Sequence, residues 1–333
     1  MDIPTHALAS LALARGFFPR RRWPVAVGMI FAGILADIDL VTALFGPGAY
    51  LAGHRTFTHS AAGTIAVIVL AALFTRRLSK KQPESWRVVL LAATCAATLH
   101  PLLDLAQSEG LALLWPFRNT RFAEDWLPTI DPWLLAALIA GILVPELFLL
   151  VTSEIGAKSK SPRGRNGALA AFVLILIYLA TRAILHSSST AMLESRTYHG
   201  ESARKVGAFP SALSLVTWRG IAETESLICL LEVPAGSARN FDPEAADCMH
   251  KPESSPELDA AQKTAVAQNY LEVARFPRAA VAKTQNGFEV VLRSMVDQAQ
   301  EERRHRVAAM IFLTPQYAVT GQTLVWLNDV HLR

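Results

Sequence analysis

The segment Trp23–Phe45 reads WPVAVGMIFAGILADIDLVTALF, and it decides the class of fold. A helix needs about 20 apolar residues to cross the roughly 30 Å hydrocarbon core of a bilayer, and this segment is long enough. Its only charged residues are Asp37 and Asp39, both near its end. Because an ionisable group inside a span is costly, such a group marks function by default. The segment therefore predicts a membrane helix that carries functional carboxylates.

Five further apolar segments lie in the first half of the chain. They are Ile3–Phe18, Ser60–Thr75, Arg87–Ala106, Pro132–Val151 and Gly167–His186. The first is short for a crossing, and the others approach the required length. The mean hydropathy of +0.29, with 52% hydrophobic and 18% charged residues, is typical of a membrane protein with a soluble part attached. The net charge of +4 sits in short clusters between apolar runs, which argues against nucleic-acid binding.

From Ser187 onward the sequence becomes an ordinary mixture of polar and apolar residues. We therefore predict an α-helical polytopic membrane bundle of about six spans, residues 1–186, followed by a soluble α+β domain with an antiparallel sheet, residues 187–333. A polar helical stretch is expected at Thr190–Lys205 and a second helix at Ser255–Phe276, with Ser255 as its N-cap. A hairpin turn is expected at Asn286-Gly287. Strands are expected at Leu215–Ala222, Glu225–Val233, Ala279–Lys283, Phe288–Ser294, Arg306–Leu313 and Thr323–Leu327.

Basic residues predict how the bundle is oriented. Of the 17 Lys and Arg residues before Ser187, 13 fall at Arg15–Arg22, Arg76–Arg87 and Lys158–Arg165, which are alternate connections. The other two connections, residues 46–59 and 107–131, hold three. The positive-inside rule places the basic connections in the cytoplasm of a bacterial-type inner membrane. The chain start, the two other connections and the C-terminal domain are then expected outside.

Seven His and Asp side chains then fall at one membrane face. They lie at the outer ends of the first four segments: His6, Asp37, Asp39, His54, His59, His100 and Asp104. The orientation rests on basic residues alone, so this convergence is independent of it. The sequence predicts a polar site at the outer membrane face.

Imidazole and carboxylate groups in this mixture suit Zn²⁺, with Mn²⁺ or Fe²⁺ as alternatives, and seven candidates suffice for one or two ions. His100 and Asp104 are four residues apart and share a helix face. Asp37 and Asp39 lie about 200° apart on a straight α-helix, so both reach the site only if the helix breaks there. One of them is alternatively an outer residue that orients a histidine.

Other polar residues have structural interpretations. Asp2 is favoured as the N-cap of the first helix over a metal ligand. Glu146, on the cytoplasmic half, is interpreted as a local packing or ion-pair partner. Cys229 and Cys248 lie in the outer domain, where oxidation is permitted, and the sequence is consistent with a disulfide or with two buried thiols.

The motifs around these residues resemble the YdjM-like family of inner-membrane metal-dependent hydrolases. The resemblance rests on Ala36-Asp37-Ile38-Asp39 combined with His54-Arg55-x-x-Thr58-His59-Ser60, and on His100-x-x-x-Asp104. It covers the membrane half well and the last hundred residues only loosely. It implies a metal-dependent hydrolase in the inner membrane without naming a substrate. Pro101, directly after His100, departs from the pattern and places a helix-disrupting residue beside a ligand.

These observations predict a membrane-bound hydrolase with a metal held by His and Asp side chains. Asp39 is expected as a ligand or general base, and Arg55, with Arg118 or Arg121 in support, as the group that binds a phosphate oxygen. A site at headgroup depth favours a lipid-linked or phospholipid phosphoester. The alternative is a non-enzymatic metal-binding transporter or envelope scaffold. The absence of His-Glu-x-x-His and Gly-x-Ser-x-Gly argues against an intramembrane protease.

Overall fold

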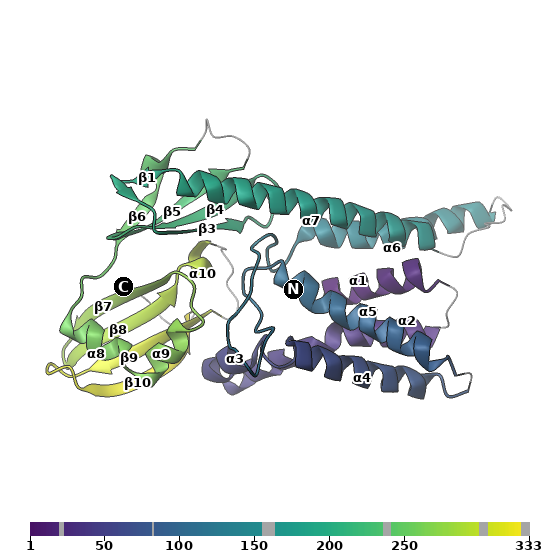
Figure 1. Cartoon of the computed structure of the whole chain (residues 1–333), viewed down its shortest axis with the longest axis horizontal. Coiled ribbons are helices and arrows are strands. Elements are labelled where there is room, and N and C mark those ends of the chain that lie inside the picture. The colour runs from purple at the N-terminus through teal and green to yellow at the C-terminus, as the bar shows by residue number, and fades with distance from the viewer. Residues whose placement is uncertain (20–22, 82, 155–163, 236–240, 300–305, 328–333) are drawn as a thin grey trace. The chain divides into compact units, whose positions relative to one another are not determined.

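The structure, a computed structural model, describes residues 1–19, 23–81, 83–154, 164–235, 241–299 and 306–327 (Figure 1). The chain divides into two compact units. The helical unit comprises Met1–Asp39 and Arg55–Ala183, and the sheet unit comprises Leu40–His54 and Ile184–Arg333. Most of the basic residues at Arg15–Arg22 and Lys158–Arg165 lie outside the described residues.

Eight helices account for most of the described chain up to Glu194. They are α1 (Ile3–Phe17), α2 (Trp23–Ile34), the 3₁₀ helix η1 (Leu35–Phe45), α3 (Pro47–Gly53), α4 (Ala61–Leu78), α5 (Trp86–Leu105), α6 (Pro132–Glu154) and α7 (Arg165–Glu194). Within the described residues, five stretches are long and apolar enough to cross a membrane: Trp23–Phe45, Ala61–Leu78, Trp86–Leu105, Pro132–Leu149 and Arg165–Glu194. With α1 as the short first segment of 15 residues, the predicted membrane bundle is confirmed.

Short polar side chains fix where these helices begin. The Asp2 carboxylate accepts a hydrogen bond from the Thr5 amide at 2.9 Å, which confirms the predicted N-cap of α1. Ser60 and Ser85 cap α4 and α5 in the same way. Each cap satisfies an amide that the helix itself leaves without a partner. The cap at Ser60 also fixes the start of α4 directly after His59.

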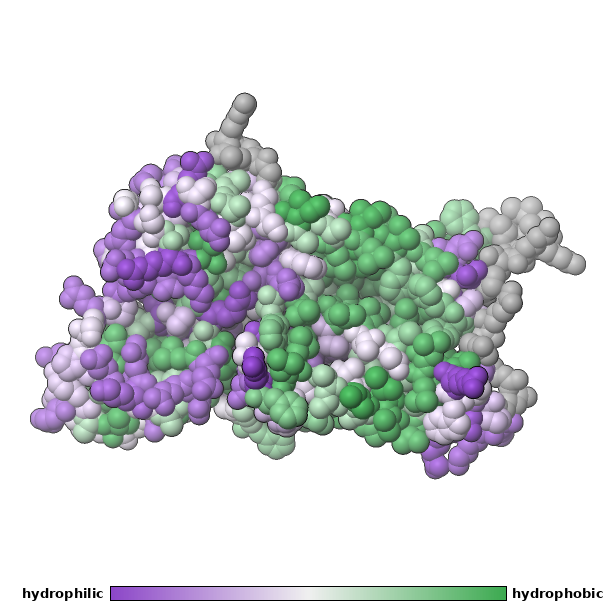
Figure 2. Space-filling view, viewed as in Figure 1, coloured by the Kyte–Doolittle hydropathy of each residue, from purple (hydrophilic) through white to green (hydrophobic). Residues whose placement is uncertain are grey.

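Small residues form much of the interior of the helical unit. Its first core cluster contains six alanines from α4 and α5. Between α6 and α7 the backbones approach so closely that a Cβ on Gly167 would lie 2.5 Å from the Gly141 carbonyl oxygen and 2.2 Å from Pro145 Cγ. Such contacts between small residues are the usual way in which helices pack in membranes, where association depends on close fit. Figure 2 shows the outer surface of these helices as largely hydrophobic.

The sheet unit contains two four-stranded antiparallel sheets among its described residues. One has the order β3-β4-β5-β6 and the other the order β10-β9-β8-β7. The first sheet consists of β3 (Lys205–Pro210), β4 (Thr217–Glu223), β5 (Leu227–Pro234) and β6 (Asp247–His250). The second consists of β7 (Pro277–Thr284), β8 (Gly287–Ser294), β9 (Val307–Leu313) and β10 (Val319–Trp326). A short hairpin, β1 (Thr197–Tyr198) and β2 (Glu201–Ser202), precedes them. The α+β class is confirmed.

Several local predictions need correction. The expected helix Ser255–Phe276 is two helices, α8 (Pro256–Gln262) and α9 (Ala265–Leu271), because the Thr264 side chain caps a new helix at Ala265. The expected polar helix Thr190–Lys205 is wrong beyond Glu194, where α7 ends and the β1–β2 hairpin begins. Strands β3 and β6 were not predicted. The β7–β8 hairpin exists, with Thr284 paired to Gly287, so its turn falls one residue earlier than expected.

The sheet unit also takes in a segment from the membrane half. Tyr50 and Leu51 of α3 pack against the core of the second sheet beside Leu324 and Trp326 of β10, and the Tyr50 and Trp326 ring centroids lie 5.5 Å apart. This packing could not be predicted from the sequence, because nothing in an apolar heptapeptide indicates a partner so far along the chain. A fragment of residues 187–333 would lack α3 and its contacts with this core.

Candidate metal centre

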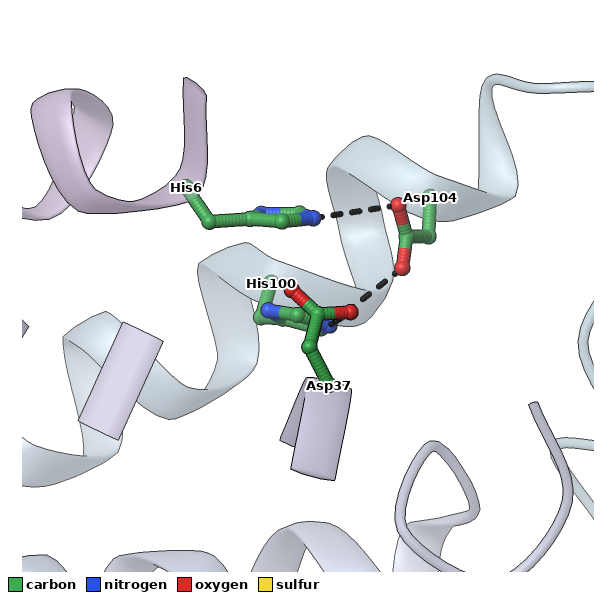
Figure 3. Close-up of side chains that lie close together, drawn as sticks. All are labelled: His6, Asp37, His100 and Asp104. Carbon is green, nitrogen blue, oxygen red and sulfur yellow. Dashed lines mark hydrogen bonds and ion pairs between the residues drawn. The ribbon is translucent and has the colours of Figure 1, made fainter. Parts of the chain in front are cut away.

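Four side chains from three helices meet in the interior of the helical unit (Figure 3). His6 comes from α1, Asp37 from η1, and His100 and Asp104 from α5. One potential ligand atom of each lies within 4.8 Å of those of the other three, and all four residues are buried. The rings of His6 and His100 stack with their centroids 3.7 Å apart. We call these four residues the metal cluster.

The position of Asp37 depends on a change of helix type. α2 ends at Ile34, and the chain continues as η1 from Leu35. This is the break that the two aspartates required, and it sends them to different partners. Asp37 Oδ1 lies 3.6 Å from His100 Nε2. Asp39 instead contacts the residues that precede α4. The two carboxylates therefore serve different purposes.

His59, which lies just before α4, extends the metal cluster. Its Nε2 lies 3.0 Å from His100 Nε2, 3.2 Å from Asp104 Oδ2 and 3.7 Å from Asp37 Oδ1. His59 is fully buried. These distances make it a fifth candidate ligand beside the four of the metal cluster.

Outer contacts fix which nitrogen of each histidine faces the centre. His59 Nδ1 lies 3.0 Å from Asp39 Oδ2, and His100 Nδ1 lies 2.6 Å from the Gly33 carbonyl oxygen. In both rings Nδ1 can donate outward, which leaves Nε2 directed at the carboxylates. Metal-binding histidines are commonly held in this way by a carboxylate or a backbone carbonyl.

Asp39 is itself held by the segment that carries His59. Its Oδ2 accepts hydrogen bonds from the Arg55 amide at 2.9 Å and the Thr58 hydroxyl at 2.6 Å. Arg55 has a positive φ of 56°, so its amide is turned into position by an unusual backbone conformation. Asp39 therefore acts on the centre through His59.

Gly33 allows α1 and α2 to approach at this point. A Cβ on Gly33 would lie 1.9 Å from the Ser10 hydroxyl oxygen and 3.3 Å from the His6 carbonyl oxygen. The same residue supplies the carbonyl oxygen that His100 contacts. Any side chain at this position would push α1, and His6 with it, away from the centre.

The carboxylates of the centre attract cations. The Met1 ammonium group contacts Asp104 Oδ1, and the guanidinium of Arg55 lies 3.6 Å from the same oxygen. Burial alone lowers the pKa of His59, which precedes the membrane-spanning part of α4, but its hydrogen bonds to Asp104, Asp37 and Asp39 outweigh burial and raise the pKa to about 10. The same carboxylates would also attract a metal cation.

The donor set fits a divalent transition metal. Two imidazoles and two carboxylates form the metal cluster, and His59 adds a third imidazole. His6 Nδ1 and Asp37 Oδ2 are buried and have no hydrogen-bond partner among the described residues. Because a buried polar atom without a partner is costly, such atoms in a native protein require an explanation, and a bound metal ion is one. A set of imidazole and carboxylate ligands without a thiolate suits Zn²⁺, Mn²⁺ or Fe²⁺.

Not every predicted residue joins the centre. The His54 ring stacks on Tyr50 with centroids 4.7 Å apart, within the sheet unit, and its role as a ligand stays a prediction. Arg55 contacts Glu109 at 3.1 Å through Nε and donates to Gln107 at 2.8 Å. Glu146 pairs with Arg15 at 3.2 Å, in keeping with a local role.

Sequence reasoning missed the residues that hold the centre from outside. No sequence pattern distinguishes Thr58, Gly33, Gln107 and Glu109, although Thr58 lies inside the His54–Ser60 motif. Pro101 does not end α5, which continues through it to Leu105. His100 and Asp104 consequently remain on one helix and both reach the metal cluster.

Comparison with known proteins identifies the relatives of this arrangement. The model of the YdjM inner membrane protein family matches residues 1–188, which include every residue of the centre. The chain belongs to this family. As a YdjM family member with several apolar helices, it is a multi-pass inner membrane protein.

Two relatives of this YdjM family member are informative. Inner membrane protein YbcI of Escherichia coli K12 is 31% identical over 131 residues, which cover 37% of this chain and 71% of that protein. YfhP of Bacillus subtilis strain 168 is 27% identical over 154 residues, 43% of this chain and 46% of that protein. The match therefore spans less than half the length of YfhP. No solved structure matches the chain.

Proposed function

We propose that this protein is a metal-dependent hydrolase whose centre lies at the outer face of the inner membrane. Its substrate class is a lipid-linked or phospholipid phosphoester. The observation that carries the proposal is the metal cluster, a buried group of His and Asp side chains whose ligand atoms lie within 4.8 Å of one another. Ionisable groups gathered inside a membrane bundle are costly to maintain and are expected where they serve function.

The centre lies at one end of the helices that form it. His6 is at the start of α1, Asp37 in the last part of the span Trp23–Phe45, and His59 just before α4. His100 and Asp104 are in the last two turns of α5. A transporter would hold its site near the middle of the bilayer, between its two halves. A centre at headgroup depth favours chemistry on a lipid phosphoester over transport.

The residues present suit hydrolysis. A divalent metal, zinc in our assignment, supplies a water molecule of lowered pKa and polarises a phosphoryl oxygen when bound. His6, Asp37, His100 and Asp104 would hold it, with His59 as a further ligand. Asp39 is assigned as the positioning residue that orients His59, because its Oδ2 contacts His59 Nδ1. The Arg55 guanidinium, already beside Asp104, would bind a phosphate oxygen.

The orientation of the chain also supports an outer site. Cys229 and Cys248 form a disulfide that joins β5 to β6. Structural disulfides persist in oxidising compartments such as the periplasm and are rare in the cytoplasm. Together with the excess of basic residues in alternate connections, this supports an extracytoplasmic C-terminal unit. A reporter fused after Arg333 that is active only in the cytoplasm would contradict this orientation.

The proposal is tested by hydrolysis and metal content in the same samples. The full chain is purified in mild detergent, and metal per chain and phosphoester hydrolysis are measured with phospholipid micelles and with bis(p-nitrophenyl) phosphate. We expect one or two bound metal ions per chain and hydrolysis that is lost after chelation. Asp104→Ala and His59→Ala should lose both, because Asp104 and His59 come from different elements and meet only in the centre.

Two control variants separate the parts of this proposal. His250→Ala, at the exposed end of β6, should leave both metal and hydrolysis unchanged. Arg55→Lys should keep the metal and lower kcat/KM, because an ammonium cannot reproduce a forked guanidinium contact. Full metal in both His59→Ala and Asp104→Ala would reject the centre. Full metal with no hydrolysis of any phosphoester would reject the reaction and leave the metal site intact.

A further inference from the structure

The turn between β3 and β4 is unusually apolar for an exposed loop. Residues 211–216 read SALSLV. Leu213 is 78% exposed, and Leu215 and Val216 are also exposed. Leu213 is the most exposed large hydrophobic residue among the described residues from 195 to 327. Exposed apolar side chains that gather in one place are typical of surfaces that contact a protein or a membrane.

The strand register shows where this turn lies along α7. A Cβ on Gly220 of β4 would lie 2.8 Å from Leu193 Cδ2, so Gly220 faces the end of α7. Two residues closer to the turn, the Trp218 ring lies 5.4 Å from the ring of His186, seven residues earlier on α7. β3 and β4 lie beside the last part of α7 (Figure 1). The strand therefore runs back along the last part of α7, and its turn lies toward Ile184 rather than toward Glu194.

The length of α7 locates the bilayer surface. Its 30 residues extend about 45 Å, whereas about 20 residues suffice for the hydrocarbon core. Counted from Arg165, the crossing ends near Ile184, which is 69% exposed. Each strand residue advances about 3.3 Å, so Val216 and Leu215 lie roughly 7–10 Å beyond Trp218. The turn is consequently level with the boundary between headgroups and acyl chains.

Two backbone amides at the end of the turn already have hydrogen-bond partners within it. The Ser214 hydroxyl oxygen accepts hydrogen bonds from the Val216 amide at 3.3 Å and the Thr217 amide at 2.9 Å. Amides that already have a partner avoid much of the cost of leaving water. The turn thus combines outward apolar side chains with internally satisfied amides.

We propose that residues 211–216 insert into the membrane surface, with Leu213 and Val216 in contact with lipid on the side where α7 leaves the bilayer. The partner is the bilayer itself, because the turn lies level with Ile184, where the length of α7 places the end of its crossing. The contact would fix the first sheet against the membrane. This inference does not depend on the metal centre or on its activity.

A fluorescent probe at the turn tests this proposal in the intact chain. Cys95, the free cysteine among the described residues, is replaced by Ala, and Leu213→Cys is labelled with an NBD group. The matched control is Asn286→Cys, on the exposed β7–β8 turn. Both proteins are reconstituted into phospholipid vesicles. The readouts are NBD emission and its quenching by iodide in water or by nitroxide groups on the acyl chains.

The expected result is a blue-shifted emission at position 213, quenched several-fold more strongly by acyl-chain nitroxides than at position 286. Quenching of position 213 by iodide to the same degree as position 286 would place the turn in water and overturn the proposal. Shielding from both quenchers would show that protein covers the turn, and this too would overturn it. The labels sit on exposed side chains, so a folding defect is readily checked by the monodispersity of the two proteins.

Discussion

The two units place polar and apolar side chains in opposite ways. In the helical unit the interior holds His6, Asp37, His59, His100 and Asp104, whereas the outside exposes large residues such as those of α7. In the sheet unit the interior is built from Leu, Ile, Val and aromatic side chains, as in the core around Tyr270 and Ile311. Buried polar side chains are few there among the described residues, with Thr224 and Thr264 as examples.

The difference shows what each unit uses to hold together. Burial of apolar area stabilises the sheet unit, because its unfolded chain would expose that area to water. Burial of apolar area contributes little between helices that are surrounded by lipid, because lipid is itself apolar. Close contact of small residues and buried polar contacts must therefore stabilise the helical unit. The helical unit can therefore carry a polar centre in its interior, and its packing depends on glycine and alanine.

The largest expected effect tests this dependence on small residues. Gly167→Ala should strongly reduce the yield of monodisperse folded protein, because its Cβ would lie 2.2 Å from Pro145 Cγ and 2.5 Å from a backbone oxygen. Overpacking of this kind typically costs about 1–3 kcal/mol, and more where backbone must move. The measurement is thermal stability by fluorescence-detected size-exclusion chromatography in detergent.

The matched substitution in the sheet unit is Gly321→Ala. Its Cβ would lie 3.4 Å from Phe312 Cδ2, an ordinary contact, so little change is expected. Equal losses of thermal stability in the two variants would contradict the proposed difference in packing between the units.

The next effect concerns the disulfide of the sheet unit. Replacement of both Cys229 and Cys248 by Ala should cost that unit about 3 kcal/mol, since the bond closes a loop with a sequence separation of 19. Metal content should stay unchanged, because the metal cluster belongs to the helical unit. Chemical denaturation followed by Trp fluorescence, with metal analysis of the same sample, measures both. A loss of metal would show that the units are coupled.

A smaller effect is expected from the residue that orients His59. Asp39→Asn keeps the size of the side chain but weakens the contact to His59 Nδ1, which now lies at 3.0 Å. Loss of such an outer partner typically lowers metal affinity about 10–100-fold. Competition with a chelator of known affinity gives the value, and Asp247→Asn, at the exposed start of β6, is the control. An unchanged affinity in Asp39→Asn would remove its positioning role.

The smallest effect is a pH dependence within the sheet unit. Hydrogen bonds from the Ser226 and Thr224 side chains lower the pKa of Glu201 from 4.5 to about 2. Because the folded pKa is the lower one, this contribution to stability is present above about pH 4.5 and is lost as the pH falls toward 2. Glu201→Gln should therefore lower Tm slightly at pH 7, and the difference from the wild type should shrink near pH 3. A difference that grows on acidification would refute this.

The sequence predicted the class of each unit because hydrophobic periodicity is a local property. The long apolar runs gave the spans, and β8 and β9 followed from runs of β-branched and apolar residues. β3 was missed because its sequence, KVGAFP, contains Gly and Pro, which are uncommon in strands. β6 has only four residues, DCMH, and its pairing with β5 is not visible in so short a run.

For the candidate site, the sequence predicted which residues share a membrane face but not the direction of each side chain. Helix ends that alternate across a membrane bring His6, Asp37 and Asp104 to one face, and topology alone shows this. The direction of each side chain required structure, since the change from α2 to η1 separates the partners of Asp37 and Asp39. The contacts of Arg55 with Gln107 and Glu109 are specific to the folded loops and leave no sequence pattern.

The packing of α3 on β10 has a consequence for how the protein is made. α3 ends at Gly53, whereas β10 begins at Val319, so the partner of α3 leaves the ribosome more than 250 residues later. At about 5–20 residues per second, this delay lasts roughly 15–50 s. The loop between Asp39 and Arg55 must therefore wait through most of synthesis with its apolar face uncovered, a period in which chaperones or the insertion machinery have the opportunity to bind it.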